Sequence, residues 1–111
     1  MKIDFNAPIN TVYGVQVLHE FPDPEKPGED MEEGLTLRHV VVEALLQNEQ
    51  GMDAKTKLSR YLLAMRVHES NGFAELSVKE AATTQRLVAK AYPPLVVGQA
   101  YPLLEGKPPT E

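Results

Sequence analysis

The sequence contains no cysteine and no tryptophan. Without cysteine there is no disulfide framework, and no thiolate is available as a nucleophile or a metal ligand. No apolar run approaches the roughly 18 residues of a membrane-spanning helix, and prolines and a glycine interrupt the longest uncharged stretch near the end, AYPPLVVGQAYPLL. The start, MKIDFNAP, lacks the continuous apolar segment of a signal peptide. We therefore expect a cytoplasmic protein.

Motifs for catalysis and phosphate binding are also absent. GxSxG, GxGxxG and the Walker pattern do not occur, so no nucleophile elbow and no glycine-rich phosphate cradle is predicted. His19, His39 and His68 lack the HxxxH and HExxH spacings of zinc sites. We therefore predict a non-enzymatic protein with no catalytic residue, metal or cofactor. A small hydrolase built from scattered histidines and carboxylates is the third alternative.

Length and charge describe one polarised domain. The 111 residues, 42% of them apolar, leave room for one core, and we predict a single domain over 1–106 with a flexible tail at 107–111. The net charge of −5 is uneven. Residues 20–33 hold seven acids and one base, whereas 54–92 hold seven bases and three acids. Acidity therefore belongs to one segment of the chain.

Residues 1–19 predict a β-hairpin. Apolar and polar side chains alternate around Ile3 and Phe5 and again over 13–19, a pattern typical of half-buried strands. Pro8 lies between the two runs and favours a turn. Because a lone two-stranded hairpin is marginal in water, we expect it to pack on helices or to pair with another chain.

Residues 20–34, EFPDPEKPGEDMEEG, predict an acidic loop. Three prolines, two glycines and repulsion between like charges all oppose a regular element. We expect a solvated linker. The alternative is a segment that docks on a basic surface, either of a partner or of this protein's own helices.

Helical periodicity predicts helices between residues 35 and 105. The four helices start near Leu37, Ala54, Val78 and Pro94, with predicted caps at Thr36, Asp53 and Ser77, the last in a capping box with Glu80. Their predicted inward faces are Leu37, Val40, Val41, Ala44 and Leu45; Leu58, Tyr61, Leu62 and Met65; Thr84, Leu87, Val88 and Ala91; and Val97, Ala100, Tyr101 and Leu104. The fold class is therefore α+β, an N-terminal β-hairpin packed on a bundle of three or four helices.

The last helix carries more apolar surface than one short helix can place in a small core. Val42 and Leu46 likewise lie off the main apolar face of the first helix. An apolar excess on two sides of an element indicates either burial on both sides or a surface used for association. The candidate partner-binding residues are Leu95, Val96, Val97, Tyr101 and Leu104.

A basic stripe on the third helix gives the main alternative. Lys79, Thr83, Arg86 and Lys90 recur at helical spacing and could contact phosphates or base edges, as in a nucleic-acid-binding regulator. The acidic net charge and the absence of aromatics in the stripe argue against that function.

Three segments, LTLRHVVVEALL, KLSRYLLAMRV and VAKAYPPLVVGQAYPLLEG, together resemble small proteins of tailed bacteriophages and prophages. The resemblance covers about residues 35–106 and rests on packing residues. It implies a bacterial cytoplasm during infection and a task performed by contact, as a host-protein inhibitor, an assembly factor or a virion component. Our leading prediction is therefore binding to another protein or to itself, without a membrane or a small-molecule substrate.

Overall fold

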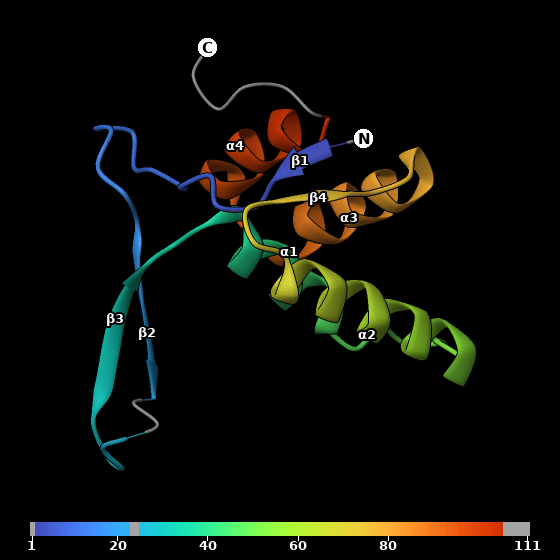
Figure 1. Ribbon diagram of the computed structural model, residues 1–111, viewed down its shortest axis with the longest axis horizontal. Helices are drawn as coiled ribbons and strands as arrows, with labels where there is room; N and C mark the ends of the chain where they lie inside the picture. Colours follow the sequence, from blue (N-terminus) through green and yellow to red (C-terminus); the bar gives the residue numbers. More distant parts are fainter. Residues whose placement is uncertain (1, 23–24, 106–111) are drawn as a thin grey trace.

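The computed structural model describes residues 2–22 and 25–105, and within them it places four α-helices and two small antiparallel sheets (Figure 1). The predicted α+β class is confirmed. The elements are β1 (Lys2–Asp4), β2 (Leu18–Pro22), β3 (Asp30–Gly34), α1 (Leu37–Leu46), α2 (Ala54–Glu69), β4 (Phe73–Glu75), α3 (Val78–Ala91) and α4 (Pro94–Leu104). The tail predicted at 107–111 lies outside the described residues.

The two runs predicted to form an N-terminal hairpin over 1–19 do not pair with each other, although an isolated antiparallel bridge joins Asn10 and Gln16. β1 instead pairs with β4, so that Ile3 lies opposite Ala74, 71 positions later in the sequence. The alternation after β1 is nevertheless used, because Phe5, Ala7 and Ile9 are buried. Period-two patterning therefore predicted which side chains point inward, but the partner strand depends on the packing of distant helices.

The segment predicted as an acidic loop, 20–34, contains regular structure. β2 and β3 form an antiparallel ribbon that projects from the helices (Figure 1). The prediction was wrong because the chain breakers spare the strand interiors: Pro27 and Gly28 lie in the connection, while Pro22 and Gly34 are the last residues of β2 and β3. We call the described residues of 18–34 the acidic arm.

The base of the acidic arm is held by backbone hydrogen bonds. The Val17 N–H donates to the Ile9 carbonyl at 2.8 Å, the Leu35 N–H to the Val17 carbonyl at 2.6 Å, and the Ile9 N–H to the Leu35 carbonyl at 2.9 Å. The Gln99 side chain of α4 accepts from the Asn10 N–H at 2.7 Å and donates to the Asn10 carbonyl at 2.6 Å. The arm is therefore fixed where it leaves the body.

α1 forms the centre of the body and packs against both α2 and α3, while α3 also packs against α4. Its predicted inward face is confirmed, since all five of its residues are buried: Leu37, Val40, Val41, Ala44 and Leu45. Thr36 occupies the N-cap position but makes no capping hydrogen bond through its side chain. The first turn of α1 is instead held by other bonds.

Arg38 supplies several of these bonds. Its guanidinium donates to Asn6 Oδ1 at 2.5 Å, to the Val67 carbonyl at 3.3 Å and to the Ser70 carbonyl at 2.9 Å. These acceptors come from the N-terminal segment and from the last turn and C-cap of α2. One side chain therefore ties three parts of the body together, and nothing in its sequence context predicted this role.

α4 is rotated relative to its prediction. Val96 and Leu103 are buried, whereas Val97 and Tyr101 are half-buried, so the predicted inner face is partly wrong. Residues at i, i+3 and i+7 share one side of a helix, and Gln99 lies on the side of Val96 and Leu103. Its two hydrogen bonds to Asn10 hold that side against the body.

Candidate protein-interaction surfaces

α2 exposes the face that its periodicity predicts as inward. The side chains of Leu58, Tyr61 and Leu62 are 58%, 51% and 57% exposed, and Met65 is half-buried. These positions follow the i, i+3, i+4, i+7 spacing and therefore lie along one side of the helix. We call these four residues the outer stripe.

The opposite side of α2 contacts the core. Ala64 and Val67 are buried there, and Leu63 packs against the same cluster. The distance between packed helices depends on the side chains at the contact, so a small residue such as Ala64 allows α1 to approach closely. The prediction that the outer stripe faces the core is wrong. α2 has apolar residues on both sides, and the side with the smaller residues Ala64 and Val67 is the one that packs against the core.

The exposed apolar surface continues from α2 onto the end of α1. Leu46 is 55% exposed, and it lines a hollow of about 190 Å³ together with Met52 and Tyr61. Covering a half-exposed leucine contributes on the order of 1 kcal/mol. Contiguous exposed apolar patches mark interaction sites on soluble proteins, so this surface is a candidate one.

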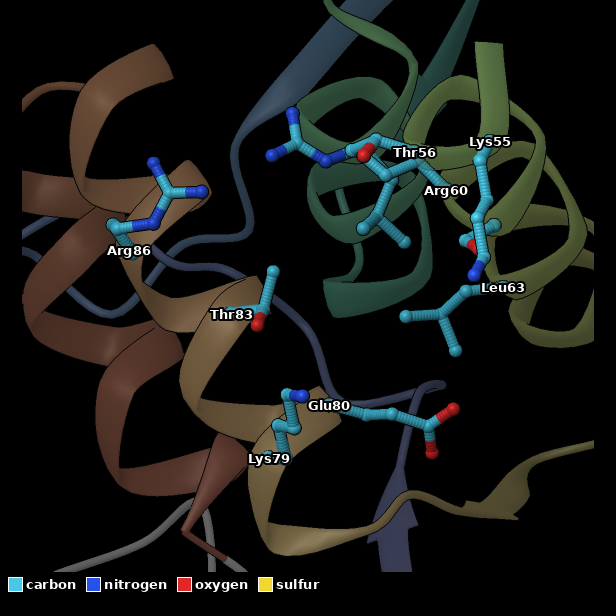
Figure 2. Close-up of a pocket in the computed structure, with 10 residues that line it drawn as sticks. Lys55, Thr56, Arg60, Leu63, Lys79, Glu80, Thr83 and Arg86 are labelled. Atoms are coloured by element: carbon cyan, nitrogen blue, oxygen red, sulfur yellow. The ribbon is translucent and has the colours of Figure 1, made fainter. Parts of the chain in front are cut away.

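A second surface is a groove of about 470 Å³ between α2 and α3 (Figure 2). Leu45 and Leu63 contribute apolar surface to its lining. Figure 2 shows residues of α2 facing residues of α3 across the groove. Its four cationic residues are Lys55 and Arg60 of α2 and Lys79 and Arg86 of α3. We call this site the basic groove.

Glu49 binds three cations beside the basic groove. Its carboxylate lies 2.5 Å from Arg60 Nη1, 2.7 Å from Lys90 Nζ and 3.4 Å from Arg86 Nη1. Hydrogen bonds from Lys90 and then Arg60 lower the pKa of Glu49 to about 2. One negative charge facing three positive charges leaves a local positive excess.

Away from Glu49, a second ion pair joins the two helices that form the basic groove: Arg66 of α2 and Glu80 of α3 lie 2.7 Å apart. Partial desolvation of Glu80 would raise its pKa, but the Ser77 N–H and the Arg66 guanidinium outweigh it, and the pKa is lowered. In the described part of the chain, Lys55 and Lys79 form no ion pair. The basic groove therefore keeps cationic side chains that no internal carboxylate neutralises.

The basic stripe predicted on the third helix is only part of this site. Lys79, Thr83 and Arg86 line the basic groove, whereas Lys90 lies outside its lining and pairs with Glu49. Sequence reasoning missed Lys55 and Arg60 as part of the site. The excess of bases over 54–92 was the available signal, but the packing of two helices decides which of those bases converge.

The predicted partner-binding residues of α4 separate into two groups. Val96 and Leu104 belong to the core, with 5% and 0% exposure, so their prediction as contact residues is wrong: the rotation of α4 and its packing on α3 bury them. Leu95 is 37% exposed, and Val97 and Tyr101 are half-buried. For these three residues, partner contact stays a prediction.

Two of the three histidines meet at the base of the acidic arm. The ring centroids of His19 and His39 lie 3.9 Å apart. Burial lowers the pKa of His39, and the nearby His19 lowers it further. Neither the basic groove nor the hollow beside Leu46 is lined by a histidine. Across residues 2–22 and 25–105, no group of three or more His, Cys, Asp or Glu side chains could hold a metal ion.

In the part of the chain that the structure describes, no helix is both long enough and apolar enough to cross a membrane. Comparison with known proteins adds no family: no family model, no curated protein and no solved structure matches the chain. The resemblance to small phage proteins therefore stays a prediction.

Proposed function

We propose that this chain works by binding another protein through the outer stripe of α2 and the adjoining Leu46, and not by catalysis. The observation that carries this proposal is the second apolar side of α2, which lies on the surface while the first side lies in the core. A row of apolar anchors at i, i+3, i+4 and i+7 is the way an amphipathic helix engages a partner. The partner would present an apolar helical face or groove.

The surroundings of the outer stripe support the same function. Lys57, Arg66 and Glu69 are exposed and lie on α2 beside the apolar residues. An apolar centre with a polar rim is the usual anatomy of a protein–protein interface. The two exposed leucines and Tyr61 would be the anchors of the contact, and tyrosine is enriched among residues that dominate binding energy.

The biological setting is proposed from the phage resemblance alone. In a bacterial cytoplasm during infection, a protein of this kind would inhibit a host protein, assist assembly or join a virion. Each of these tasks is a contact between proteins, so each is compatible with an apolar surface stripe.

The test compares two changes that each add negative charge to exposed apolar positions. Leu58→Glu with Leu62→Glu disrupts the outer stripe, while Val78→Glu, at a position that is 74% exposed in the first turn of α3, is the control. A photo-reactive residue in place of Tyr61 should cross-link a specific partner. We expect capture of that partner to fall more than tenfold with the double variant, since each lost hot-spot contact removes about 1 kcal/mol or more.

The control should capture the same partner at the level of the unchanged protein. Circular dichroism would verify that all variants remain folded. If the double variant captures the partner as well as the Val78→Glu control does, the outer stripe is not the binding surface and the proposal fails.

Nucleic-acid binding is the second candidate, because the basic groove gathers cations from two helices. Weighing against it, Glu49 already engages Arg60, Arg86 and Lys90. The test is fluorescence anisotropy with duplex DNA and single-stranded RNA oligonucleotides. If the groove binds phosphates, the affinity for the oligonucleotides should fall steeply as salt is raised and in the Arg86→Glu variant. An affinity that changes with neither would eliminate this function.

A further inference from the structure

The acidic arm contacts its own helices near its base, where the centroid of the His19 ring lies 3.9 Å from that of the His39 ring of α1, and from there it projects away from the body (Figure 1). β2 and β3 pair with each other, and neither strand packs broadly on a helix. An isolated two-stranded ribbon is marginally stable in water. Among the described residues this sheet has two strands, so the outer edge of each strand presents backbone groups that no further strand pairs. The arm therefore has the properties of an element that is completed by another molecule.

The charges on the arm point to a cationic partner. The register places Glu20 directly opposite Glu32, and like charges at opposed positions destabilise a strand pair. Asp30 is two residues from Glu32 in β3 and therefore points to the same face. All three side chains are exposed. A surface rich in lysine and arginine would relieve this repulsion.

The basic groove has the complementary composition. Its exposed cations are Lys55, Lys79 and the partly neutralised Arg86, and they surround apolar Leu63. Arg60 also lines the groove but is largely buried against Glu49. On the arm, an apolar residue lies among the acids in the same way: Leu18, opposite Gly34, shares the face of Glu20 and is 60% exposed. Both charge and apolar contact therefore match between the two surfaces.

The arm does not reach the groove of its own chain. It leaves the helices on the side away from α2 and α3 (Figure 1). Its base is fixed by the hydrogen bonds that join Ile9, Val17 and Leu35, so it does not swing as a free tail. An arm and a groove of this chemistry can therefore meet only between two molecules.

We propose that a second copy of this chain fills the basic groove with the Glu20, Asp30 and Glu32 face of its acidic arm. A two-fold symmetric exchange produces two identical arm-to-groove contacts and a closed dimer. This contact uses a surface other than the outer stripe, so it goes beyond the function proposed above and stands or falls independently of it.

The experiment is a charge exchange followed by sedimentation velocity. One variant carries Glu20→Lys and Glu32→Lys in the arm, and another carries Lys55→Glu and Lys79→Glu in the groove. At a concentration where the unchanged protein is dimeric in low salt, each variant alone should be monomeric. An equimolar mixture should dimerise again, because the basic arm of one variant meets the acidic groove of the other.

A control variant, Glu43→Lys with Glu75→Lys, makes the same change in net charge as the arm variant, at exposed positions outside the arm, the basic groove and the outer stripe. It should dimerise like the unchanged protein. Raising the ionic strength from about 0.05 to 0.5 M should weaken the dimer by roughly tenfold or more, since exposed charges are screened over a few ångströms at high salt. Circular dichroism spectra would establish that each variant is folded before its association is measured.

Three association results overturn the arm exchange: an unchanged protein that stays monomeric at millimolar concentration in low salt, a dimer that survives the arm variant, or a mixture that remains monomeric. A dimer that survives the arm variant but is lost with Leu58→Glu and Leu62→Glu would belong to the outer stripe. That result would contradict the arm exchange while supporting the proposed function. Oligonucleotide binding in the groove, with association unaffected by the arm substitutions, would also overturn it.

Discussion

α2 and α3 begin in the same way and are used differently. Both follow a cap that the sequence predicts: Asp53 accepts from the Thr56 N–H at 2.8 Å, and Ser77 forms a capping box with Glu80. α3 then buries its predicted apolar face, including Leu87, whereas α2 turns its predicted face outward. Periodicity therefore predicts that a helix face needs covering, but it does not say which molecule covers it.

The difference follows from the second side of each helix. Opposite its apolar face, α3 carries Lys79, Arg86 and Lys90, so only one orientation on the core is favourable. α2 carries Ala64 and Val67 opposite the outer stripe, so either side could pack inward. Where a helix has two apolar sides, the side left on the surface is the better candidate for a binding site.

The largest expected effect comes from making the same substitution in both helices. Leu87→Ala, at a position 3% exposed, should lower the free energy of unfolding by about 2–5 kcal/mol because it leaves a cavity. Leu62→Ala, at 57% exposure, should lower it by less than about 1 kcal/mol. Urea unfolding measures both values. Equal losses would mean that the two leucines are equally buried, which would contradict the comparison.

A second test compares two arginines that attach α2 to its neighbours: Arg38 joins α1 to the end of α2, and Arg66 joins α2 to α3. Arg38→Ala breaks bonds to Val67 and Ser70 at the end of α2 and should cost about 2–3 kcal/mol, since hydrogen bonds from charged donors are strong. Arg66→Ala breaks only an exposed ion pair with Glu80 and should cost less than about 1 kcal/mol. Urea unfolding of the two variants measures both losses. If α2 were held mainly against α3, Arg66→Ala would lower the free energy of unfolding more than Arg38→Ala does.

The caps should contribute equally, because both helices use them in the same manner. Asp53→Ala and Ser77→Ala should each lower the free energy of unfolding by about 1 kcal/mol. The matched replacement Thr36→Ala should change it less, since Thr36 makes no capping bond through its side chain. A loss at Thr36 as large as at Ser77 would show that this comparison of caps is wrong.

The smallest expected effect is a pH dependence of stability due to Glu49, whose carboxylate pairs with cations of both α2 and α3. Its pKa in the folded protein, about 2, lies below its ordinary value of 4.5. The unfolded chain therefore binds the proton first, and the stability that Glu49 contributes above pH 4.5 is lost as the pH falls toward 2. Glu49→Gln should be less stable than the unchanged protein near neutral pH, and the two should converge in acid. A difference that stays constant between these limits would contradict the assigned ion pairs.

Much of the helical part could be predicted because its signals are local. Asp53, Ser77 and Glu80 identify helix starts from a few neighbouring residues, and the α1 face from Leu37 to Leu45 follows directly from spacing. Strand pairing could not be predicted in the same way. β1 pairs with β4 across a stretch of sequence that contains α1 and α2, and no property of Ile3 or Ala74 names the other as its partner.

The candidate surfaces were predictable only in part for the same reason. Lys79, Thr83 and Arg86 were identified on one helix, but Lys55 and Arg60 join them only when α1 holds α2 and α3 side by side. Residues 20–34 of the acidic arm were predicted as a loop because of their three prolines, two glycines and like charges. Backbone pairing, which composition does not reveal, gives that segment its structure.

The most direct test of the account uses the absence of cysteine, which allows clean single-cysteine variants. In dilute purified protein, Leu62→Cys and the exposed control Val78→Cys should both react rapidly with a thiol reagent, and Leu87→Cys should react slowly. In the presence of the captured partner, Leu62→Cys alone should become protected. Slow labelling of Leu62→Cys in the purified protein, or equally rapid labelling with the partner bound, would contradict the claim that the outer stripe is a binding surface.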